Sequence, residues 1–176
     1  MVLPAFHKMA TGQGVGYGTT IFAQRMKLAR SYAVTQREYI AVIIPTGIGA
    51  PPDMNYRYYR CAIVDSTSVF QRWVDGEKWE TLPVGASFYT SNNATTVTKV
   101  DCSDIGGVAE EDSSKILAFI FKPSGQVKAL AATPDLIIAE GVWEDTTGSP
   151  TFISKNDNNR RTITINRYTG RVKIDG

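Results

Sequence analysis

Few residue types in this sequence could carry out catalysis. His7 is the only histidine among 176 residues, so a Ser-His-Asp or Cys-His arrangement would have to use it. It lies in an N-terminal segment that its glycines make flexible. A zinc site needs three or four clustered Cys, His or carboxylate ligands, and one histidine with two well-separated cysteines does not supply them. We therefore expect a protein that is not an enzyme, with no catalytic residue, metal ligand or cofactor.

The two cysteines, Cys61 and Cys102, leave two alternatives open. In an oxidising compartment they could pair and close a loop of about 40 residues, which would stabilise the fold by about 3–4 kcal/mol. Alternatively, Cys61 is a buried thiol on a strand and Cys102 an unpaired thiol in a polar stretch. Two cysteines are too few for a disulfide-rich scaffold, so the core must come mainly from apolar burial.

Glycines stand at every second position of the segment GQGVGYG, residues 12–18. The dinucleotide fingerprint needs glycine at its first, third and sixth positions, directly after a strand. Counted from the first or the second glycine, the sixth position here is Tyr17 or Thr19, and no strand precedes the segment. Each glycine inside a helix costs about 1 kcal/mol relative to alanine. The series therefore predicts a weak or flexible helix and no nucleotide site.

An acidic stretch could hold a calcium ion, because hard cations bind loop oxygens. No EF-hand spacing is present, and the alternative is a solvated acidic loop. The residues concerned are Asp101, Asp104, Glu110, Glu111 and Asp112.

Basic residues crowd the C-terminal end of a chain whose net charge is only +2. If they share one face, they form a patch for phosphates or for a protein partner. Tyr168 could then stack on a base. Alternatively, they are solvent-facing charges that protect an edge strand from aggregation. The residues of this candidate patch are Arg160, Arg161, Arg167, Arg171 and Lys173.

One amphipathic helix is expected from Thr19 to about Arg37, because apolar residues recur there at spacings of three and four. Thr19 or Thr20 could cap a helix that restarts after the glycines. No apolar run approaches the ~20 residues of a membrane span, so the chain as given is expected to be soluble. The residues expected to pack this helix on a sheet are Phe22, Met26, Leu28, Ala29 and Ala33.

After this helix the pattern changes to short strands separated by turns. Asp75-Gly76 predicts a hairpin between residues 70–74 and 78–82, and residues 90–115 and 144–159 are expected to be irregular. Strands never alternate with helices, which excludes a parallel βαβ sheet. We expect an α+β fold in which a long N-terminal helix, residues 1–37, packs on antiparallel sheet in residues 38–176, within one domain. The other expected strands are residues 39–44, 58–65, 116–121, 127–130, 136–139, 162–166 and 171–174.

Four stretches resemble the GspH/FimT-type pseudopilins and minor pilins, in the order found in that family. They are the helix residues 28–33 (LARSYA), residues 78–85 with a leucine-proline-x-glycine element, residues 118–125 with a strand and glycine turn, and the closing hairpin, residues 161–174. Residues 1–6 look like the tail of the family's apolar membrane helix, so we expect a leader and most of a membrane span to precede them.

This resemblance implies a structural role. The full-length protein would be stored in the inner membrane through its helix, with the β-rich domain in the periplasm or on an extracellular filament. Its partners would be other pilin or pseudopilin subunits, and secreted protein cargo. One alternative is a minor pilin that binds DNA during uptake, with Arg160, Arg161, Arg167, Arg171 and Lys173 as the contact residues. Another is a soluble binding module of unrelated fold. Whether the filament belongs to type II secretion or to a type IV pilus stays open.

Overall fold

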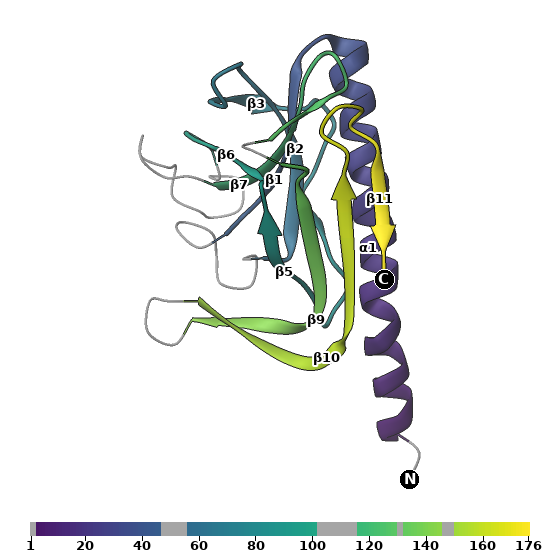
Figure 1. Ribbon diagram of the computed structural model, residues 1–176. Coiled ribbons are helices and arrows are strands. Elements are labelled where there is room, and N and C mark those ends of the chain that lie inside the picture. The colour runs from purple at the N-terminus through teal and green to yellow at the C-terminus, as the bar shows by residue number, and fades with distance from the viewer. Residues whose placement is uncertain (1–2, 47–55, 102–115, 130–131, 146–149) are drawn as a thin grey trace.

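The computed structural model describes residues 3–46, 56–101, 116–129, 132–145 and 150–176. One long helix, α1 (Leu3–Gln36), packs on two antiparallel sheets, which confirms the expected α+β fold. Figure 1 shows α1 along one side of the molecule, with its N-terminal end extending beyond the sheets. Within the described residues, no helix combines the length and apolarity that a membrane span requires.

Helix α1 continues through the glycine series, so the expected helix restart was wrong. Thr19 does not cap a new helix; its hydroxyl donates to the carbonyl of Val15, one turn back, at 2.6 Å. Thr20 makes the same bond to Gly16 at 3.0 Å. Hydroxyl bonds of this type belong to helix interiors. Tertiary contacts described below outweigh the poor helix propensity of glycine.

The larger sheet contains β1 (Tyr39–Ile44), β2 (Tyr58–Val64), β3 (Phe70–Trp73), β4 (Glu80–Thr81), β6 (Thr95–Val97), β7 (Ile116–Phe121) and β8 (Val127–Lys128). Their order is β3-β2-β1-β7-β6, with β4 beside β2 and β8 beside β7. Both faces of the central strand β1 are buried, which explains its unbroken apolar sequence. Ile40 and Val42 belong to the core beneath α1, whereas Ala41 and Ile43 belong to a second apolar cluster on the other face.

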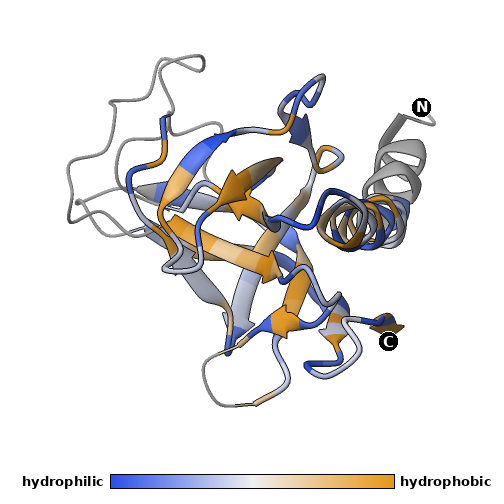
Figure 2. Ribbon diagram, turned by 90° about the horizontal axis from the view of Figure 1, so that it is seen from above, coloured by the Kyte–Doolittle hydropathy of each residue, from blue (hydrophilic) through white to orange (hydrophobic). Residues whose placement is uncertain are grey.

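The smaller sheet contains β5 (Ala86–Asn92), β9 (Asp135–Asp145), β10 (Pro150–Ile165) and β11 (Val172–Asp175), in the order β11-β10-β9-β5. The closing hairpin β10–β11 was predicted correctly. Strands β9 and β10 are longer than the strands expected at 136–139 and 162–166, and they form a hairpin that bends where its register shifts, between Ser154 and Arg160. Figure 1 shows its outer part turning away from α1. Figure 2 shows α1 lying against one side of the sheets.

Three local expectations were wrong. Strands β3 and β4 do not pair with each other; both pair with β2, one after the other along its edge. Residues 90–97, expected to be irregular, form the end of β5 and all of β6. In the stretch 144–159, β9 reaches Asp145 and β10 begins at Pro150. The polar composition of both stretches reflects strands with solvent-facing side chains.

Candidate assembly surfaces

The buried stripe of α1 fixes the helix to both sheets. Phe22, Met26, Ala29 and Ala33 are fully buried in the main core. The ring of Phe22 lies edge-on to two aromatic rings of the sheets, those of Tyr59 on β2 and Phe88 on β5, each with centroids 4.9 Å away. One helix side chain thus joins the two sheets.

Leu28 does not take part in this packing, contrary to expectation. Its side chain is 38% exposed. Successive helix residues are about 100° apart, so Leu28 lies about 100° around the axis from the buried Ala29. Tyr17, on the same helix face as Leu28, is also exposed, whereas Val34 is exposed on a different face, beside the Gly125 turn. The helix therefore has an uncovered side with apolar residues on it.

Two of the glycines allow a loop to contact the helix closely. A Cβ atom on Gly18 would lie 2.9 Å from Cδ of Pro83, and one on Gly14 would lie 3.3 Å from the carbonyl oxygen of Val84. A Cβ on Gly16 would meet nothing within 4 Å. Gly14 and Gly18 are four residues apart, hence on one helix face. The spacing of four residues indicated a close helix contact, which an interpretation based on glycine at every second position overlooked.

A partly buried ion-pair cluster links the middle of α1 to the segment before and within β4. The guanidinium of Arg25 binds the carboxylates of Glu77, at 2.5 Å, and Glu80. The side chains of Arg25 and Glu77 are only 15% and 9% exposed. The hydroxyl of Tyr32 donates to Glu77 at 3.4 Å, and its pKa is raised by burial and by that carboxylate. Arg25 lies more than fifty positions from Glu77 and Glu80, so no local sequence pattern could predict this ion pairing.

Cys61 lies beside this cluster, fully buried on β2. Burial, and next the charge of Glu77, raise the pKa of its thiol to about 12, so it has no nucleophilic character at neutral pH. Its suggested disulfide partner, Cys102, lies outside the described residues, and the pairing stays a prediction. The acidic stretch from Asp104 to Asp112 also lies outside them. In the described part of the chain, no group of three His, Cys, Asp or Glu side chains is placed to hold a metal ion.

Arg30 connects α1 to one turn of each sheet. Its Nε donates to the carbonyl of Gly125, in the turn between β7 and β8, at 3.1 Å. The same Nε donates to the carbonyl of Thr169, in the closing hairpin, at 2.9 Å. Gly125 and Gly170 have φ angles of 79° and 65°, which favour glycine. The two turns meet so closely that a Cβ on Gly170 would lie 2.0 Å from the carbonyl oxygen of Gly125.

The five basic residues predicted at the C-terminus do not form one patch. Arg160 binds Asp157 at 2.8 Å, with its guanidinium 4.7 Å from the ring centroid of Tyr89. Lys173 is ion-paired with Asp175.

The remaining three of these basic residues diverge as well. Arg161 lies on the same face of β10 as the buried Ile163, whereas Lys173 is paired with Thr164 and lies on the opposite face. The guanidinium of Arg167 lies 5.1 Å from the ring centroid of Tyr168. Arg171 lines one groove together with the helix residues Lys27 and Arg30, and a second hollow together with Lys173.

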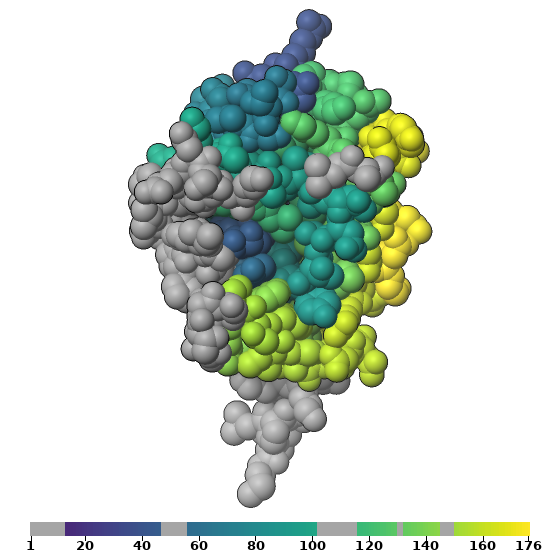
Figure 3. Space-filling model, turned by 60° about the vertical axis from the view of Figure 1, so that its left-hand side comes forward, coloured from purple at the N-terminus to yellow at the C-terminus, as the bar shows by residue number. Residues whose placement is uncertain are grey.

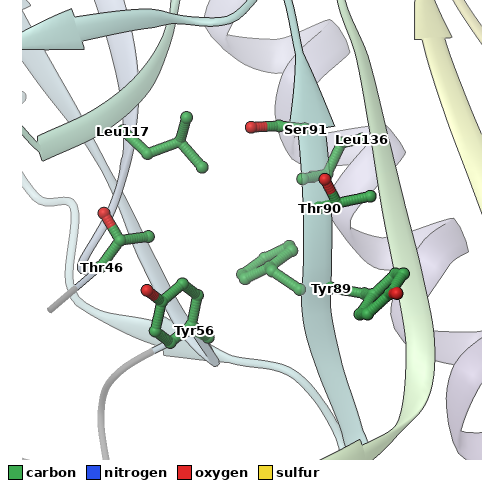
Figure 4. Close-up of a pocket in the computed structure, with 8 residues that line it drawn as sticks. Thr46, Tyr56, Tyr89, Thr90, Ser91, Leu117 and Leu136 are labelled. Carbon is green, nitrogen blue, oxygen red and sulfur yellow. The ribbon is translucent and has the colours of Figure 1, made fainter. Parts of the chain in front are cut away.

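A hollow of ≈ 270 Å³ opens between the two sheets, on a face away from α1. Figure 3 shows the surface hollowed beside β1, in blue, and β5, in teal. In the close-up of Figure 4, Thr46, Tyr56 and Leu117 lie on one side and Thr90, Ser91 and Leu136 on the other. The described residues that line it carry hydroxyl and apolar groups and no charge: Thr46, Tyr56, Phe88, Tyr89, Thr90, Ser91, Leu117 and Leu136.

An aromatic pair holds one wall of this hollow. The rings of Tyr56 and Trp143 stack with centroids 4.0 Å apart, and the indole N–H of Trp143 donates to the carbonyl of Phe88 at 2.8 Å. Burial raises the pKa of Tyr56. Such a wall suits an apolar or neutral polar contact, and the described lining residues offer no pair of nucleophile and base.

The sequence matches no protein-family model and no curated protein. The structure resembles that of the minor pseudopilin EpsH from the type 2 secretion system of Vibrio cholerae, with a TM-score of 0.50 and 13% sequence identity over 92% of this chain and 96% of that one. A second structure of EpsH aligns with a TM-score of 0.42 at 13% identity, over 82% and 96% of the two chains. The likeness to the first structure shows that this chain has the GspH-type pseudopilin fold.

Proposed function

We propose that this chain is a minor pseudopilin, a structural subunit of a type II secretion filament that acts by assembly and makes or breaks no covalent bond. The observation that carries the proposal is the fold: one helix fixed along two antiparallel sheets, as in EpsH of the Vibrio cholerae type 2 secretion system. The N-terminal end of α1 extends beyond the sheets (Figure 1), where a neighbouring helix can reach it.

The geometry suits a subunit that transmits force. Phe22 joins both sheets, Arg25 binds the β4 segment, and Arg30 binds one turn of each sheet. Contacts to rigid elements at three levels of α1 keep the helix from sliding along the sheets. These contacts suit a subunit whose helix and β-rich domain move together as one body.

The uncovered side of α1 is available to other subunits. Tyr17 and Leu28, which lie on one face of the helix, expose apolar surface there, at 64% and 38%. Burying this surface against a neighbouring helix would contribute to filament stability. The neutral hollow between the sheets faces away from α1 and would remain open to a further subunit or to cargo. As a pseudopilin, the protein would be stored in the inner membrane with its β-rich domain in the periplasm.

Deletion of the gene, followed by mass spectrometry of the culture medium, tests this function. We expect a set of secreted proteins to remain in the cells and to reappear in the medium when the gene is restored. An unchanged set of secreted proteins would refute the type II assignment. Loss of surface pili with normal secretion would assign the subunit to a type IV pilus instead, and loss of DNA uptake alone would favour the DNA-binding alternative.

A further inference from the structure

A groove separates α1 from the closing hairpin at the edge of the molecule. Its volume is ≈ 420 Å³, and it is lined by Lys27 and Arg30 from the helix and by Gly170, Arg171 and Val172 from the hairpin. Figure 2 shows α1 and the C-terminal strand at the same side of the sheets. The groove is therefore next to the uncovered side of the helix.

This groove is positively charged. Lys27, Arg30 and Arg171 all line it, and no acidic side chain is among its lining residues. The nearby helix cannot neutralise them, because α1 has no Asp or Glu between Leu3 and Gln36. Arg30 is held by two backbone carbonyls, which leave its charge in place. In the part of the chain that the structure describes, neither Lys27 nor Arg171 forms an ion pair.

Exposed apolar side chains flank the charges. Val34 lies four residues after Arg30 on the same helix face and is 46% exposed. Tyr168, in the same turn as Gly170, is 70% exposed. Arginine and tyrosine beside exposed aliphatic surface are typical of protein–protein contacts.

We propose that this groove binds an acidic segment of a neighbouring pilin-type subunit, whose carboxylates pair with Lys27, Arg30 and Arg171. The inference rests on the proposed function. Beyond that function, it specifies where one contact between subunits lies and that the contacting surface of the neighbouring subunit is acidic. Carboxylates are favoured because the groove presents planar guanidinium groups, which bind them in a bidentate way, and because apolar contacts adjoin the charges.

Nucleic acid fits this surface less well. Duplex DNA carries one charge per about 1.7 Å of its axis, so it needs an extended track of cations. Lys173 lines a second hollow together with Arg171, but the neighbouring basic residues do not supply a track of unpaired charges. Arg160 and Lys173 are already paired with carboxylates of this chain, and Arg161 lies on the sheet face opposite to Lys173.

A zero-length carbodiimide cross-linker tests the proposal on the full chain in the membranes of its own bacterium. The reagent couples a lysine amine to a carboxylate only when the two are in contact. Lys27 is therefore a natural reporter, and Arg171→Lys adds a second one across the groove. We expect cross-links from these positions to Asp or Glu of a second protein that carries a pilin-type apolar helix.

Charge reversal supplies the matched functional measurement. The double variant Lys27→Glu/Arg171→Glu should lower incorporation into the subunit assembly about tenfold or more, because like charges then face each other. Lys155→Glu, an exposed position on β10, should leave incorporation unchanged. Lys27 and Arg171 are both exposed, so the thermal unfolding midpoint of the double variant should stay close to that of the wild type.

Three results would overturn the inference. Normal incorporation of the folded double variant would show that the groove contacts no acidic partner, while the proposed function would stand. A 12-base-pair DNA duplex that binds the wild type but not the double variant, with subunit cross-links absent from Lys27, would assign the groove to nucleic acid. A wild-type chain found in no assembly with pilin-type subunits would refute both the function and the inference.

Discussion

The close contact between α1 and the loop at Pro83 predicts different effects on stability of the same substitution at two glycines. Gly18→Ala places a Cβ atom 2.9 Å from Cδ of Pro83 and 3.3 Å from Cδ2 of Leu82. Gly16→Ala places one in open space, with nothing within 4 Å. Both positions lie inside α1, so both substitutions gain the same helix propensity, about 1 kcal/mol.

The difference between the two variants isolates the contact. Pro83 has a rigid ring and cannot rotate away, so the loop or the helix must shift. Overpacking of this kind costs about 1–3 kcal/mol. Gly16→Ala should therefore stabilise the protein by about 1 kcal/mol, and Gly18→Ala should be less stable than Gly16→Ala by about 1–3 kcal/mol.

Thermal and urea unfolding followed by circular dichroism measure this difference. For a domain of this size, 1 kcal/mol corresponds to about 2–4 °C in the unfolding midpoint. Pro83→Ala combined with Gly18→Ala removes the ring atom and should recover part of the loss, which a double-mutant cycle reveals. Equal stability of Gly16→Ala and Gly18→Ala would refute the contact. The glycine series would then be explained by helix flexibility alone.

Three further predictions concern the interior. Phe22→Ala should cost about 3–5 kcal/mol in the free energy of unfolding, whereas Leu28→Ala should cost less than about 1 kcal/mol, since Leu28 lies outside the core; equal losses would contradict the packing described. Arg25→Ala leaves the carboxylate of Glu77 buried and unpaired and should cost about 3–5 kcal/mol, while Arg25→Met/Glu77→Leu should recover most of it in urea unfolding. Burial raises the pKa of Cys61 from its ordinary 9.0 to about 12. The folded state therefore keeps a proton that the unfolded state loses, and stability present below pH 9 falls as the pH rises towards 12, by up to about 1.4 kcal/mol per pH unit. Cys61→Val should lessen this slope in unfolding experiments between pH 8.5 and 10.5, and an unchanged slope would assign it to other groups.

The elements with regular apolar patterns could be predicted from the sequence. The unbroken run of β1 and the glycine turn of the closing hairpin both follow local rules, and the structure has them where expected. Strand β5, whose second half is polar and partly exposed, and the outer part of β9–β10 were missed, because strands of mixed composition have little periodicity. Amino-acid composition and turn signals cannot distinguish such strands from loops.

The candidate surfaces were harder to predict because they depend on long-range contacts. Arg25 is bound to residues more than fifty positions away in sequence, and nothing local marks Glu77 as its partner. Clustered basic residues at the C-terminus suggested one patch, yet strand alternation sends Arg161 and Lys173 to opposite faces. The contribution of Arg171 becomes visible only beside Lys27 of the helix.

If the chain is a filament subunit, the uncovered side of α1 contacts other pilin-type subunits. A photo-reactive amino acid at Gln24, which is exposed and lies about half a turn from the buried stripe, tests this most directly in intact cells. We predict cross-links to proteins with pilin-type helices from position 24, and far fewer from Asn158, an exposed residue on β10. Cross-links from position 24 only to unrelated proteins, or none in cells that make the chain at its natural level, would contradict this prediction.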